Sequence, residues 1–86
     1  MKSFATDSFW HAYENLPADV RRAARKQYRL WLENSQHPSL QFKPVGILWS
    51  VRITLHCRAL ALFENGAYHW FWIGSHQEYD RLVKRR

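Results

Sequence analysis

Apolar residues recur along the chain at two different spacings. In the first part they follow the three-to-four-residue period of an amphipathic helix, and beyond Pro38 they alternate or form short runs, as strands do. We therefore predict two helices, a run of antiparallel strands and a short terminal helix. Helices grouped before a strand meander are typical of an α+β layer, in which two helices pack on one face of a small sheet.

The two predicted helices are separated by Pro17. Thr6 or Asp7 can cap the first helix, which is expected to end near Leu16. The second is expected from about Pro17 to Asn34, with the proline in its first turn. Its apolar positions gather on one side and are Val20, Ala23, Ala24, Gln27, Leu30 and Trp31. Its outer side is basic and carries Arg22, Arg25, Lys26 and Arg29.

Strands are predicted in the remainder of the chain. They span residues 2–5, 40–43, 47–55, 58–63 and 67–73, and a final amphipathic segment spans 77–86. The expected connections are Pro44-Val45-Gly46, His56-Cys57 and a hairpin turn of the Asn-Gly type at Glu64-Asn65-Gly66. The strand at 67–73 is apolar on both faces, which indicates a position inside the sheet.

Size and composition indicate one small, basic domain. The 86 residues suit a single domain, residues 1–86, and five Trp, five Phe and four Tyr compensate for a thin core. Thirteen Lys and Arg against seven Asp and Glu give a net charge of +6, which favours an anionic partner. That partner can be nucleic acid, an acidic protein segment or a membrane surface. A basic protein without such a partner is the alternative.

The cysteine and histidine content argues against disulfides, metal binding and thiol catalysis. Cys57 is the only cysteine, so no internal disulfide is possible and a cytoplasmic location is expected. No secretory signal is evident, and no apolar run approaches the roughly 20 residues that span a bilayer. The histidines and Cys57 form no paired metal-ligand motif, no glycine-rich phosphate loop is present, and no oxyanion site accompanies the thiol. We therefore expect no metal, no cofactor and no membrane partner.

Two arginines and a histidine are the main candidates for chemistry. If strands 47–55 and 58–63 pair as a hairpin, Arg52 and Arg58 lie close together, and a bound anion would relieve their repulsion. His76 follows the interior strand, where an imidazole can exchange protons near neutral pH. Tyr79 can stack on a base or pack in the core. Solvated arginines and a surface histidine are the alternative.

Several short motifs occur in an order that resembles a known family. They are Leu16-Pro17, Val20-Arg21-Arg22-Ala23, His37-Pro38-Ser39-Leu40 with Phe42-Lys43, Trp49-Ser50-Val51-Arg52-Ile53, Arg58-Ala59-Leu60, and Trp70-Phe71-Trp72-Ile73-Gly74-Ser75-His76 with Glu78-Tyr79. Together they cover nearly the whole chain and resemble the RelE/ParE toxin superfamily of bacterial type II toxin–antitoxin systems. The resemblance implies the same layout, with two N-terminal helices on a small antiparallel sheet and a short C-terminal helix.

Resemblance to the RelE branch implies a ribosome-dependent messenger-RNA endonuclease that acts without metal, because the 2′-hydroxyl of the RNA attacks the adjacent phosphate. By matching position, Arg58 would stabilise the transition state and His76 would act as general acid. Tyr79 would correspond to the family's terminal tyrosine. Arg52 and Lys43 would hold the substrate backbone.

The chain departs from the RelE pattern in two ways. The lysine pair of that branch is not evident, since Ser50 and Thr54 flank Arg52, and no general base is evident. The ParE branch shares the fold, lacks nuclease chemistry and inhibits DNA gyrase, and a non-toxic binding module is a third alternative. The implied partners are a cognate antitoxin, together with the ribosome and messenger RNA or, in the alternative, DNA gyrase. The basic helix side, Arg22, Arg25, Lys26 and Arg29, would contact substrate or ribosome, or be merely solvated.

Overall fold

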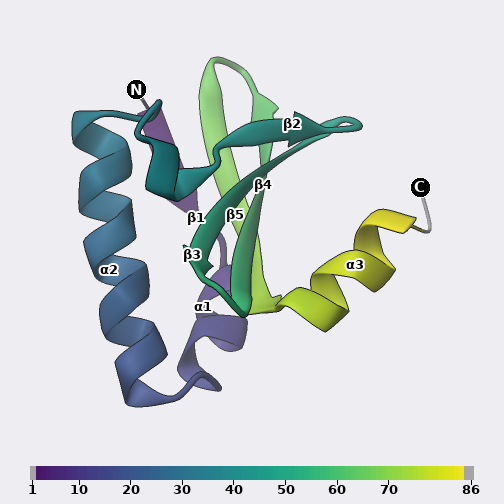
Figure 1. Cartoon of the computed structure of the whole chain (residues 1–86). Coiled ribbons are helices and arrows are strands. Elements are labelled where there is room, and N and C mark those ends of the chain that lie inside the picture. Colours follow the sequence, from purple (N-terminus) through teal and green to yellow (C-terminus); the bar gives the residue numbers. More distant parts are fainter. Residues whose placement is uncertain (1, 85–86) are drawn as a thin grey trace.

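The computed structural model describes residues 2–84. In chain order its elements are β1 (Lys2–Ala5), α1 (Asp7–Glu14), α2 (Ala18–Glu33), the 3₁₀ helix η1 (Pro38–Leu40), β2 (Lys43–Val45), β3 (Leu48–Thr54), β4 (Cys57–Glu64), β5 (Ala67–Ser75) and α3 (His76–Lys84). The strands form one sheet in the order β1-β5-β4-β3-β2 (Figure 1). The predicted α+β architecture is confirmed. None of the helices within the described range is long and apolar enough to cross a membrane.

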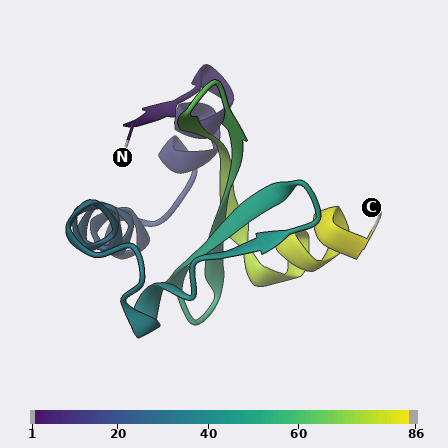
Figure 2. The ribbon, with the colours of Figure 1, turned by 90° about the horizontal axis from the view of Figure 1, so that it is seen from above.

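The sheet separates two layers of helices. α1 and α2 cover one face, where Trp31 of α2 packs in a cluster with Val51 and Ile73 of the strands. α3 lies against the other face, where Tyr79 packs with Leu48 and Leu60. A view from above shows α2 and α3 on opposite sides of the sheet (Figure 2). The two N-terminal helices therefore share a face, as predicted, and the C-terminal helix has the other.

A capping hydrogen bond marks the start of the first helix, and a proline precedes the second. The Thr6 hydroxyl accepts a bond from the Phe9 N–H at 3.2 Å and caps α1, which ends at Glu14, two residues before the predicted end. α2 follows Pro17 directly. Gln27 lies in the apolar stripe of α2 and donates to the Arg52 carbonyl oxygen at 3.1 Å, where the pairing of β3 with β4 is irregular. The amide thus satisfies a strand carbonyl that the ladder leaves free.

The predicted strand at residues 40–43 is wrong. Pro38 begins a 3₁₀ turn instead, and the His37 imidazole caps it by accepting a bond from the Ser39 N–H at 3.2 Å. Gln41 then adopts left-handed backbone with φ of 45°. β2 begins only at Lys43 and includes the proline that had been assigned to a turn. A proline is tolerated there because β2 is an edge strand.

Other boundaries also differ from the prediction. The β3–β4 turn is Leu55-His56 rather than His56-Cys57, because Cys57 pairs with Thr54 in the ladder. β1 pairs with β5 in parallel, so the sheet is only mostly antiparallel. The hairpin turn after β4 is confirmed, with positive φ at Asn65 and Gly66.

The C-terminal part follows β5 without a loop. β5 continues to Ser75, two residues beyond the predicted end, because Gly74 and Ser75 still pair with residues of β4. Gly74 also leaves room for the neighbouring indole, since a Cβ there would lie 2.5 Å from the Trp72 ring. α3 then begins at His76. Positions 85 and 86 of the predicted segment lie outside the described residues.

Candidate functional site

The strand cations of the predicted site lie on the α3 face of the sheet. Arg52 and Arg58 stand directly opposite each other on β3 and β4, so their side chains leave the sheet on the same side. Lys43 is the cross-strand partner of Ser50, which shares a face with Arg52 because strand side chains alternate. The predicted proximity of the two arginines is therefore confirmed. We call Lys43, Arg52, Arg58, His76 and Tyr79 the α3-face site.

Arg58 is held in place from two sides. Its guanidinium carbon lies 5.6 Å from the centroid of the Tyr79 ring, and its Nη1 donates to Gln41 Oε1 at 3.3 Å. Its buried Nε has no hydrogen-bond partner among the described residues. Within residues 2–84, neither Arg58 nor Arg52 is paired with a carboxylate. Neither guanidinium group is therefore neutralised by a carboxylate of the described residues, and two cations on neighbouring strands favour the binding of an external anion.

The start of α3 places an imidazole next to Tyr79, the ring that also contacts Arg58. The Ser75 hydroxyl caps the helix by accepting a bond from the Glu78 N–H at 3.2 Å. The His76 N–H donates to the His56 carbonyl oxygen at 2.8 Å, which ties α3 to the β3–β4 turn. The His76 and Tyr79 rings lie 5.7 Å apart. Tyr79 is 8% exposed, so it packs in the core and also contacts two polar members of the site.

Two further side chains belong to this arrangement and were not predicted. Asp80 Oδ2 lies 3.2 Å from His76 Nδ1, one helical turn away. The four-residue spacing on a helix was a usable signal for this pair. Gln41 contacts Arg58 only because of its left-handed backbone, for which the sequence carries no signal.

The cations of α2 lie elsewhere. Arg22, Arg25, Lys26 and Arg29 are exposed on α2, across the sheet from the α3-face site (Figure 2). Arg25 is partly engaged, since its Nη1 donates to the Tyr13 hydroxyl at 2.6 Å. The structure therefore does not bring the two predicted sets of basic residues together.

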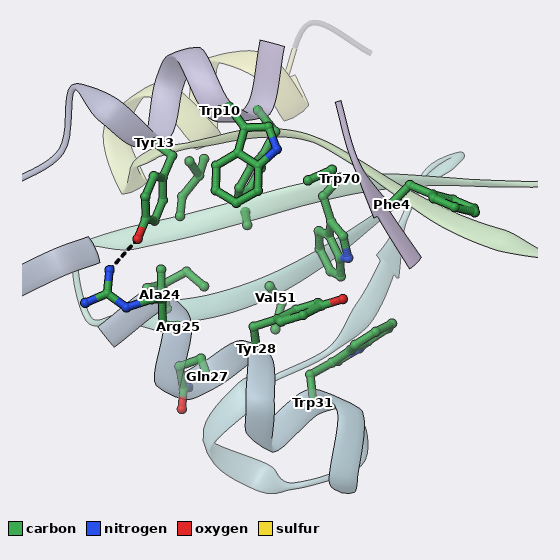
Figure 3. A pocket seen from close by; sticks show the side chains of 15 residues that line it. Phe4, Trp10, Tyr13, Ala24, Arg25, Gln27, Tyr28, Trp31, Val51 and Trp70 are labelled. Atoms are coloured by element: carbon green, nitrogen blue, oxygen red, sulfur yellow. Dashed lines mark hydrogen bonds between the residues drawn. The ribbon is translucent and has the colours of Figure 1, made fainter. Parts of the chain in front are cut away.

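An apolar cleft opens on the α1/α2 side. It has a volume of about 350 Å³ and lies between α1, α2 and the sheet, and seven of its fifteen lining residues are aromatic (Figure 3). Phe4, Trp10 and Tyr28 line it and remain 56%, 48% and 42% exposed. Arg25 reaches across toward Tyr13 at one end (Figure 3). Composition predicted a core rich in aromatic residues but could not show that several of them stay uncovered.

Thiol and metal chemistry have little support among the described residues. Burial raises the pKa of the Cys57 thiol from 9.0 to about 11, so the thiol stays protonated and weakly nucleophilic near neutral pH. Within residues 2–84, no three His, Cys, Asp or Glu side chains gather as metal ligands would. The α3-face site can bind a phosphate through two guanidinium groups and exchange a proton through an imidazole.

Comparison with known proteins adds evidence at the level of fold. No protein-family model matches the sequence, and no curated protein matches it. Among solved structures, a RelB–RelE antitoxin–toxin complex from Methanococcus jannaschii superposes with a TM-score of 0.71 at 12% identity, covering 91% of this chain and 96% of that chain. A YoeB/ParE toxin from Agrobacterium tumefaciens gives 0.67 at 21% identity, covering 88% and 99%. The isolated E. coli RelE toxin gives 0.61 at 13% identity, covering 98% and 96%. The chain therefore has a RelE/ParE-like toxin fold.

Proposed function

We propose that the protein is the toxin of a type II toxin–antitoxin system and cleaves messenger RNA on the ribosome with its α3-face site. The observation that carries this proposal is the opposed pair Arg52 and Arg58, which has no carboxylate partner within residues 2–84. Tyr79 contacts both Arg58 and the His76 ring. The fold shared with RelE and YoeB/ParE toxins supports it. The site of action would be the cytoplasm, where messages are translated.

The proposed chemistry needs only groups of the RNA and of this chain. The 2′-oxygen forms a bond to phosphorus as the bond from phosphorus to the next 5′-oxygen breaks, which leaves a 2′,3′-cyclic phosphate and a 5′-hydroxyl. The proton of the 2′-hydroxyl passes to water, and His76 gives a proton to the departing 5′-oxygen. Arg58 and Arg52 stabilise the charge that develops on the phosphoryl oxygens. Lys43 holds the adjacent backbone.

The apolar cleft supports the antitoxin half of the proposal. Exposed aromatic side chains that line one cleft, here Trp10 and Tyr28, mark surfaces that a partner covers. Arg25 at the end of the cleft, with the exposed cations of α2 nearby, would attract acidic side chains. An amphipathic antitoxin segment with apolar and acidic residues fits both features.

Primer extension on messages from cells expressing the protein tests the function. Wild type should produce breaks that require translation, and Arg58→Ala and His76→Ala should each abolish them while the proteins stay folded. Arg22→Ala on the opposite side of the sheet is the matched control and should cleave like wild type. Intact messages combined with loss of DNA gyrase supercoiling in vitro would overturn the proposal in favour of a ParE-type inhibitor.

A further inference from the structure

The His76–Asp80 pair has a consequence for proton transfer at the α3-face site. The Nδ1–Oδ2 distance is 3.2 Å, and it is the one side-chain ion pair within residues 2–84. An ionised carboxylate can only accept hydrogen bonds, so any hydrogen bond across this distance requires the imidazole to donate through Nδ1. In neutral histidine the other nitrogen, Nε2, then carries no proton.

The surroundings restrict the ring further. His76 is anchored through its backbone N–H to the β3–β4 turn, and its ring lies 5.7 Å from the Tyr79 ring. Tyr79 in turn lies under the Arg58 guanidinium. A chain of contacts therefore runs from Asp80 to the arginine that would face the phosphate.

We propose that Asp80 is a positioning residue that holds His76 as the Nδ1–H tautomer and makes Nε2 the nitrogen that exchanges protons with substrate. The inference rests on the proposed function. When protonated His76 gives its Nε2 proton to the departing 5′-oxygen, the imidazole left behind is the tautomer that Asp80 selects. Asp80 keeps its hydrogen bond to Nδ1–H throughout and gains no proton, as the carboxylate of a catalytic triad does.

A purely structural role of Asp80 can be distinguished from the proposed positioning role. Both side chains are partly exposed, 42% for His76 and 46% for Asp80, and an exposed pair four residues apart contributes little to stability. Loss of the carboxylate should therefore leave the fold intact. Its effect should appear in the ring nitrogens and in catalysis.

The test uses the ¹⁵N chemical shifts of the His76 ring in the full-length protein, at a pH where the ring is neutral. Wild type should show the Nδ1–H tautomer, Asp80→Ala should show a mixture with Nε2–H, and Asp80→Glu, which keeps a carboxylate within reach, should restore the wild-type pattern. Glu33→Ala removes the same charge from the end of α2 and should change nothing. Wild-type ring shifts in Asp80→Ala would overturn the inference.

Cleavage measurements separate this inference from the proposed function. If RNA is cleaved, Asp80→Ala should lower kcat about 10-fold or more, with little change in KM, as loss of a supporting hydrogen bond commonly does. An unchanged kcat in Asp80→Ala would also contradict the positioning role. If wild type cleaves nothing while the ring shifts still depend on Asp80, the proposed function fails and the tautomer assignment stands.

Discussion

The α1/α2 face and the α3 face of the sheet differ in packing and in what they leave exposed. On the first, Trp31 is 1% exposed and lies 5.4–5.6 Å from the rings of Phe42, Tyr68 and Trp70. On the second, the cluster of buried residues within positions 2–84 consists of Leu48, Leu60 and Tyr79, and cations occupy the neighbouring positions. The difference indicates that stability comes mainly from the first face, and it is the second face to which we assign the proposed chemistry.

The same comparison separates the two sets of basic residues. Arg22, Lys26 and Arg29 project from a helix into solvent, where each can change rotamer freely. Arg52 and Arg58 leave paired strands side by side, and Arg58 is further held by Gln41 and Tyr79. Groups held in place before the reaction stabilise a transition state better than mobile ones. Net charge alone could not separate these two sets.

The largest expected effect is on stability, and it tests the packing side of the comparison. Trp31→Ala should lower the free energy of unfolding by about 3–5 kcal/mol, because it empties a well-packed aromatic site in a protein whose total stability is on the order of 5–15 kcal/mol. Trp10→Ala, at a position 48% exposed, is the control and should cost much less. Urea denaturation measures both. Equal losses would show that the buried cluster does not dominate stability.

The next largest effect is on catalysis, and it tests the proposed role of the α3 face. Arg58→Ala should reduce RNA cleavage by about 10²–10³-fold while changing the urea midpoint little, because the loss falls on transition-state charge. Arg58→Lys keeps the charge without the planar fork and should retain only part of the activity. A large loss of stability in Arg58→Ala would mean that the α3 face is structural after all.

A smaller effect concerns the thiol in the core of the α1/α2 face. The Cys57 pKa is raised to about 11 in the folded protein by burial, so the unfolded chain, with a pKa near 9.0, loses its proton first. Stability should therefore fall as pH rises from about 9 to 11, by at most roughly 2–3 kcal/mol. Comparing the pH slopes of wild type and Cys57→Ala isolates this contribution. Parallel slopes would contradict it.

The smallest effect is expected from a substitution on the α3 face that raises stability and lowers the cleavage rate. Gln41 has left-handed backbone, which costs a non-glycine residue on the order of 1 kcal/mol. Gln41→Gly should therefore be more stable by about that amount, yet cleave more slowly because Arg58 loses its amide partner. Gln41→Asn, which tolerates the same backbone but is shorter, provides the control. Unchanged cleavage in Gln41→Gly would show that the Gln41 amide has no role in the site.

Periodicity predicted most of the fold, because the helices of this chain bury one face each and its strands carry short apolar runs. It failed where a single contact decides the structure, as in the 3₁₀ turn that His37 caps at Pro38. The parallel pairing of β1 with β5 was also missed, because it joins distant segments.

The arginine pair was predictable, because a hairpin brings Arg52 opposite Arg58. Asp80 could have been found from helical spacing, whereas Gln41 and the open cleft depend on backbone twist and on exposure that only the three-dimensional structure shows.

Cleavage of a short message on purified translating ribosomes compares the two sets of cations most directly. Wild type and a variant with Arg22, Lys26 and Arg29 replaced by Ala should both release fragments that end in a 2′,3′-cyclic phosphate, the variant with weaker binding that depends less on salt. A variant with Arg52 and Arg58 replaced by Ala should release none. Cleavage that survives loss of Arg52 and Arg58, or that is lost only with the α2 cations, would contradict the assignment of the chemistry to the α3 face.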